Sequence, residues 1–184
     1  MMKLIMSISL LGLLIIHVGS ETSSEESNDG IDAVYTMSNA APINQVFSFS
    51  INRNGRLGRR RRTINTNGAG VNTSANDPLS SQSRVVVYSN FLFVVNAGSD
   101  SLSMFTIDPK DATQLTSISV RQTNGRFPVS VTVNSRYVCV LTGGNPAGIR
   151  CFKYNRFYRF VVPSLDRTIT LNVPQTNPPS ERVQ

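Results

Sequence analysis

The sequence predicts an all-β fold, a partial β-propeller made of repeated four-stranded antiparallel blades. The main observation is an internal repeat with an offset of about 46 to 47 residues, which is a period typical of propeller blades. Each copy holds a strand, a glycine-containing turn and a second strand with alternating apolar positions. No segment keeps a helical period over three turns, which argues against a layered α/β fold. A β-sandwich is the alternative, but it needs no such repeat.

The repeat is clearest where residues 91–107 align with residues 137–154. An earlier copy runs over residues 34–51. The flanking strands also correspond, with a short apolar strand before each of the two later hairpins and a weaker fourth strand after it. These flanking strands are predicted at Val85–Val87, Leu115–Val120, Val131–Val133 and Phe157–Val162. The chain therefore holds about three blades, and the first of them has no predicted inner strand.

The two ends of the chain do not share this repeat. Residues 1–20 have the pattern of a secretory signal peptide, with Lys3 before an apolar run that ends at Ile16. A membrane anchor is the alternative, but the run is shorter than the roughly 20 residues that span a bilayer. We expect cleavage after Ser20 and a secreted, extracellular protein. Residues 21–30 are predicted to be a disordered acidic tail. Residues 31–172 are predicted to form the blades, with an inserted loop at 58–78, and residues 173–184 to form a proline-rich tail.

Positive charge is concentrated in one place. The formal net charge is +7, and Arg59, Arg60, Arg61 and Arg62 supply four positives in a row. No aromatic residues alternate with these arginines, so a nucleic-acid platform is not indicated. A solvated loop is the favoured interpretation. An anionic partner and cleavage by a basic-site protease after Arg62 are the alternatives.

The residues available for chemistry are few. The only histidine, His17, lies in the predicted leader, so a Ser-His-Asp mechanism and imidazole metal ligation are excluded from the mature chain. Asp77 precedes a candidate inner strand, and Arg126 lies at the matching entrance of the next unit, so together they are weak candidates for holding an anionic substrate. An Asp-Pro turn is the commoner role of such an aspartate. No metal, nucleotide or other cofactor is predicted, and the catalytic residues stay unassigned.

The two cysteines are predicted to form a disulfide. Cys139 and Cys151 lie at equal distances from the middle of the glycine-rich turn near Asn145. They are therefore candidates for a directly opposed pair on one sheet face, within disulfide reach, and a secretory compartment would keep the bond. The alternative is two small buried residues that pack as ordinary hydrophobes.

One glycosylation sequon, Asn72-Thr73-Ser74, falls in the predicted inserted loop. In a secreted protein of a eukaryotic host, this position predicts an exposed, glycosylated Asn72.

Several stretches resemble the lactonase-type seven-bladed propellers, a family that includes 6-phosphogluconolactonases and carboxymuconate-cyclase-like proteins. The matching stretches are Ala33–Asn39, Asn44–Phe49, Asn54–Leu57, Asp77–Ser83, Phe91–Ser99, Phe127–Val131 and Gln175–Ser180. The resemblance implies a lactone hydrolase or a muconate-type cycloisomerase that acts on a small lactone or carboxylate ligand. About three blades leave the ring of seven open, so we expect negligible turnover from this chain.

The alternative function is a non-catalytic secreted binding or interaction protein, and a remnant without a stable fold is a third interpretation. Open blade edges favour self-association. Neither nucleic acid nor a membrane is a predicted partner.

Overall fold

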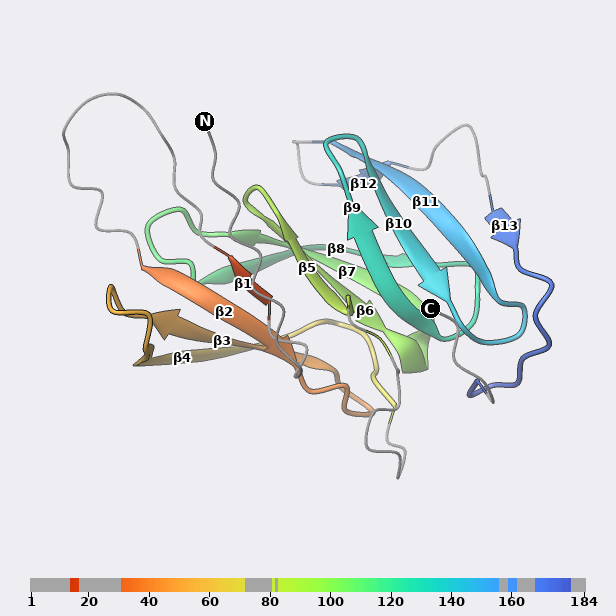
Figure 1. The fold of residues 1–184 in the computed structure, drawn as a ribbon, viewed down its shortest axis with the longest axis horizontal. Helices are drawn as coiled ribbons and strands as arrows, with labels where there is room; N and C mark the ends of the chain where they lie inside the picture. The colour runs from red at the N-terminus through yellow and green to blue at the C-terminus, as the bar shows by residue number, and fades with distance from the viewer. Residues whose placement is uncertain are drawn as a thin grey trace.

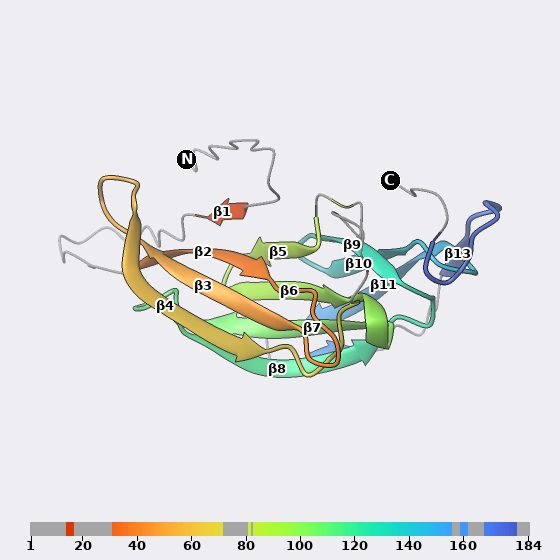
Figure 2. The same ribbon diagram turned by 90° about the horizontal axis from the view of Figure 1, so that it is seen from below.

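The computed structural model describes residues 14–16, 31–71, 81, 83–155, 159–161 and 168–179. It confirms the predicted all-β fold, because these residues form three antiparallel sheets that follow one another in chain order. Figure 1 shows the three sheets side by side. Figure 2 shows β5 (Val85–Tyr88) and β9 (Pro128–Val133) on one side of the stack and β4 (Leu57–Asn65) and β8 (Leu115–Gln122) on the opposite side. Among the described residues, no helix is long and apolar enough to span a membrane.

The first blade has the strand order β1-β2-β3-β4. Its strands are β1 (Leu14–Ile16), β2 (Asp32–Met37), β3 (Gln45–Ile51) and β4 (Leu57–Asn65). The prediction that this blade lacks an inner strand is wrong for the full chain, since β1 pairs with β2 through the register Ile16 to Ala33. This strand comes from the predicted leader, whose apolar run supplies residues with high strand propensity. The rest of that leader and the acidic tail lie outside the described residues.

The second blade matches the sequence prediction most closely. Its strands are β5 (Val85–Tyr88), β6 (Phe91–Asn96), β7 (Ser101–Ile107) and β8 (Leu115–Gln122), in that spatial order. A short 3-10 turn, Ala97–Ser99, joins β6 to β7. Every residue of β6 is buried, because this strand lies between two neighbouring strands and is covered on both faces.

The third blade differs from its prediction at its outer edge. Its strands are β9 (Pro128–Val133), β10 (Tyr137–Thr142), β11 (Gly148–Asn155), β12 (Arg159–Val161) and β13 (Thr168–Thr170). Of the fourth strand predicted at Phe157–Val162, the structure describes Arg159–Val161, which form β12. The unpredicted β13 pairs with the other half of β11. Two short strands therefore take the place of one, and the described part of the proline-rich tail, residues 173–179, contains no strand.

Two apolar clusters join the blades. Between the first and second blades, Tyr35 packs with residues that include Leu92 and Phe105. Between the second and third blades, Phe93 and Phe152 belong to the larger cluster. All four aromatic rings are almost fully buried. Truncation of such a ring to alanine typically costs about 3–5 kcal/mol, so these two interfaces hold the stack together.

A buried polar network ties the loop after β4 to the second blade. Asn96 Oδ1 accepts hydrogen bonds from Asn44 Nδ2 at 3.0 Å and from Thr66 Oγ1 at 2.7 Å. Asn96 Nδ2 donates to Ser103 Oγ at 2.8 Å. The loop runs so close to the backbone that a Cβ on Gly70 would lie 2.1 Å from the carbonyl carbon of Asn39. Glycine is therefore required at position 70. The loop holds the first and second blades in a fixed position relative to each other.

Candidate functional site

The four consecutive arginines lie on β4, the outer strand of the first blade, and not in a loop. The register of β4 against β3 places Arg62 opposite Ser48 and Arg61 opposite Phe49. The prediction of a loop at 58–78 is therefore wrong for residues 58–65. In that range Gly58 to Asn65 pair as a strand, and only residues 66–71 of the described part form a loop. A run of long polar side chains lacks the alternation of apolar and polar residues that predicts a half-buried strand. An outer strand with exposed side chains does not need this alternation.

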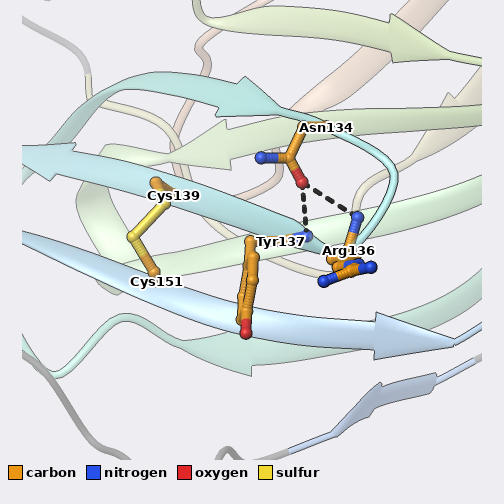
Figure 3. The surroundings of a disulfide bond; sticks show 5 residues. All are labelled: Asn134, Arg136, Tyr137, Cys139 and Cys151. Atoms are coloured by element: carbon orange, nitrogen blue, oxygen red, sulfur yellow. Dashed lines mark hydrogen bonds between the residues drawn. A yellow bond between two sulfur atoms is a disulfide. The ribbon is translucent and has the colours of Figure 1, made fainter.

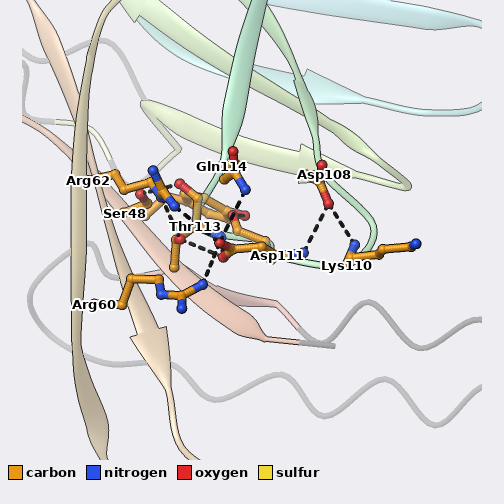
Figure 4. A network of polar contacts seen from close by, with 10 residues as sticks. Ser48, Arg60, Arg62, Asp108, Lys110, Asp111, Thr113 and Gln114 are labelled. Carbon is orange, nitrogen blue, oxygen red and sulfur yellow. Dashed lines mark hydrogen bonds and ion pairs between the residues drawn. The ribbon is translucent and has the colours of Figure 1, made fainter. Parts of the chain in front are cut away.

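One face of β4 is directed toward the second blade and meets a single buried carboxylate. Arg60 Nη1 lies 2.6 Å from Asp111 Oδ2, and Arg62 Nη2 lies 3.4 Å from the same oxygen. Figure 4 shows both arginines reaching from β4 toward Asp111 in the turn between β7 and β8. The Asp111 side chain is only 9% exposed, whereas each arginine is about half exposed. The ion pairs therefore connect the outer strand of one blade to a loop of the next.

Asp111 is held by several donors besides these arginines. Its Oδ1 accepts hydrogen bonds from the backbone N and the Oγ1 of Thr113 at 3.1 and 2.6 Å. Burial by itself raises the pKa of Asp111, but the hydrogen bonds from Thr113 and Arg60 and the charge of Arg60 outweigh burial and lower this pKa. Burial, reinforced by the nearby charges of Asp111 and Asp32, raises the pKa of Tyr35. The Asp111 carboxylate is thus kept ionised and acts as a structural partner of Arg60 and Thr113.

The opposite face of β4 carries Arg59 and Arg61. The guanidinium carbon of Arg61 lies 5.4 Å from the ring centre of Phe47 and 5.8 Å from that of Phe49, within the range of cation–π contacts. Both rings belong to β3 and are partly buried, whereas both arginines are exposed. No acidic side chain of the described residues forms an ion pair with Arg59 or Arg61.

Of the two weak candidates for holding an anionic substrate, the structure describes only Arg126. Arg126 Nη1 donates to Asp100 Oδ2 at 2.9 Å, and the backbone N of Phe127 donates to Asp100 Oδ1 at 2.7 Å. Asp77 lies outside the described residues, as does the sequon residue Asn72. Arg126 therefore anchors the entrance to the third blade through Asp100, a partner that the sequence analysis did not identify.

The predicted disulfide is confirmed. Cys139 and Cys151 are direct register partners on β10 and β11, and their sulfurs are bonded. Their Cα atoms are 4.0 Å apart, which fits the closer of the two spacings in an antiparallel pair. Figure 3 shows the bond crossing between the two strands near Tyr137. Both cysteines are partly exposed, because their face of the third blade is not covered by another sheet of the described structure.

The last feature is the capacity of the described residues to hold a metal ion or a small molecule. They contain no cluster of three or more histidine, cysteine or acidic side chains that could hold a metal ion. A pocket between the first and second blades, lined by residues that include Asp32, Asp108 and Pro109, has a volume of about 40 Å³. Asp108 Oδ1 accepts hydrogen bonds from the backbone N of Lys110 and of Asp111, so this carboxylate shapes its own turn.

Blades of this kind, stacked through their faces with β5 and β9 on one common side, define a β-propeller, of which this chain holds a part. Residues 32–148 match the family described as lactonase, 7-bladed beta-propeller, and the chain belongs to that family. No curated protein sequence matches the chain.

Two solved structures share the fold. A protein from Lactobacillus plantarum has a TM-score of 0.54 at 15% identity, over 76% of this chain and 39% of that one. A periplasmic gluconolactonase of Pseudomonas aeruginosa has a TM-score of 0.51 at 21% identity, over 80% of this chain and 41% of that one. The chain thus spans about two fifths of the length of these structures, consistent with the predicted partial propeller.

Proposed function

We propose that this chain is a secreted, non-catalytic binding protein of the lactonase family. The observation that carries the proposal is that three carboxylates of the described residues make structural contacts. Asp111 is bound by Arg60 and by Thr113, Asp100 is bound by Arg126, and Asp108 caps a turn. An acid or base for lactone chemistry must reach its substrate, whereas these groups are occupied by structural contacts.

Two further features support binding without turnover. Small-molecule sites usually occupy about 300–1,000 Å³, so the pocket of about 40 Å³ beside Asp32, one among the pockets of the described residues, holds water and not a lactone. The one histidine, His17, lies in the predicted leader. Lactone hydrolysis or cycloisomerisation on a small lactone or carboxylate, which the family implies, is the competing function.

The test of turnover uses the purified secreted protein and simple aldonolactones, with carboxylate release followed by a pH indicator. We expect a rate equal to that of buffer and of an Asp77→Asn variant. A rate that rises with protein concentration and is lost in Asp77→Asn would overturn the proposal and establish the competing function.

Secretion is tested separately, by sequencing the N-terminus of protein recovered from the culture medium. We expect Glu21 as the first residue, because the predicted cleavage follows Ser20. Protein retained in cells with Met1 in place would contradict an extracellular role.

A further inference from the structure

The outer strand of the first blade presents an extended row of positive charge. Strand β4 has nine residues, so it is roughly 30 Å long at the usual rise of a β-strand. Within the described structure it pairs only with β3, which leaves its other edge open. Arg59, Arg60, Arg61 and Arg62 are all exposed there, and Arg56 is exposed in the preceding turn. The surface is therefore linear, cationic and accessible.

The two faces of this strand differ in the charge they leave for a ligand. Asp111 offsets one of the two charges of Arg60 and Arg62. Arg59 and Arg61 have no acidic partner among the described residues. Their positive charge is therefore not offset, and an anion gains most by binding on the face that Arg59 and Arg61 share.

The guanidinium of Arg61 is already positioned. It stacks against Phe47 and Phe49, which restricts a side chain that otherwise has high conformational entropy. Stacking uses the face of the guanidinium group and leaves its N–H donors available at the edge. Two N–H donors of one guanidinium group can then bind two oxygens of the same anionic group.

From these features we propose that β4 binds a linear sulfated polysaccharide, with Arg59 and Arg61 as the main contacts. This inference rests on the proposed binding function and names its ligand. A linear polyanion follows an open strand edge, and a secreted protein meets such chains outside the cell. Single-stranded nucleic acid is disfavoured because base stacking needs free aromatic faces, and Arg61 covers Phe47 and Phe49. A membrane surface is disfavoured because β4 offers only Leu57 as a large exposed apolar residue.

The experiment measures heparin binding to the full secreted protein as a function of salt. We compare Arg59→Ala/Arg61→Ala with the control Arg136→Ala/Lys153→Ala, which removes two exposed charges from the third blade. The first variant should bind about tenfold more weakly in 0.15 M salt, from two exposed charge contacts. Its slope of log affinity against log salt should flatten by roughly two, whereas the control should stay within about twofold of wild type. All variants should melt within about 4 °C of wild type, since the largest loss is the contact of Arg61 with Phe47 and Phe49.

A third variant, Arg59→Lys/Arg61→Lys, keeps both charges and should retain most of the salt dependence. Equal weakening by the β4 variant and the control would overturn the site, because binding would then follow net charge alone. Tighter wild-type binding to single-stranded DNA or to phosphatidylserine vesicles than to heparin would overturn the ligand class. Lactone turnover would refute the proposed function independently, since it does not depend on these arginines.

Discussion

Removal of the Cys139–Cys151 bond tests how the third blade is stabilised. The perturbation is the double variant Cys139→Ala/Cys151→Ala, which deletes the cross-link and leaves no free thiol. The two cysteines are 12 positions apart in the sequence and join neighbouring strands at directly opposed positions. The backbone ladder between β10 and β11 is expected to remain, because its hydrogen bonds do not involve the side chains.

The expected loss of stability comes mainly from the unfolded state. A cross-link that closes a loop of this length lowers the unfolded chain's entropy by an amount worth about 3 kcal/mol. Burial adds little, because both cysteines are partly exposed. For a chain of this size, about 3 kcal/mol corresponds to a fall in melting temperature of roughly 6–12 °C.

The assay is thermal unfolding followed by circular dichroism, with and without reductant. Reductant should lower the melting temperature of wild type to that of the double variant and leave the variant unchanged. Thr132→Ala is the matched control, since Thr132 opposes Cys139 on β9 and is exposed. A double variant that melts within about 2 °C of wild type would refute the entropic reasoning.

Three other predictions concern Asp111, the sequon at Asn72 and the predicted cleavage after Ser20. Asp111→Asn should lower stability at neutral pH by about 2 kcal/mol. The pKa of Asp111 is lowered on folding. The difference in stability between wild type and Asp111→Asn should therefore vanish as the pH falls through the lowered pKa of the folded protein. Thermal unfolding measured at several pH values from about 2 to 7 would test this. Asn72 should be glycosylated in a eukaryotic host, so an unchanged mobility after glycosidase treatment would contradict exposure of the sequon. The predicted cleavage after Ser20 would remove β1 and open the edge of β2, so the protein without residues 1–20 should self-associate, and a sharp monomer peak in size-exclusion chromatography would contradict this.

The repeat made most of the fold predictable. Alternating apolar residues and regular turns place strands β5, β6, β7, β9 and β10 within a few residues of their observed bounds. The disulfide was predictable for the same reason. Once a hairpin has a centre, the period of two fixes which residues oppose each other, so Cys139 and Cys151 share one face.

The arginine strand and its partner could not be predicted in the same way. The polar run from Arg59 to Arg62 shows no apolar alternation, and its strand state depends on pairing with β3. Asp111 follows Arg60 by 51 residues, so only the packing of two blades reveals their contact. The aspartate was visible in the sequence, but nothing local indicated which arginine it would meet.

Pairs of opposed residues on the corresponding face of each blade differ in chemistry. The pairs are Tyr35 with Ser48, Phe93 with Met104, and Cys139 with Cys151. The first two pairs are almost fully buried, against the following blade, whereas the cysteines are only partly buried.

Burial of a large apolar side chain stabilises a fold only if another surface covers it. No described sheet covers the cysteine face of the third blade, so a phenylalanine and a methionine would contribute little there. A disulfide acts on the unfolded chain and does not depend on being covered. The cross-link therefore stabilises the third blade at the position where packing against a following blade stabilises the first two.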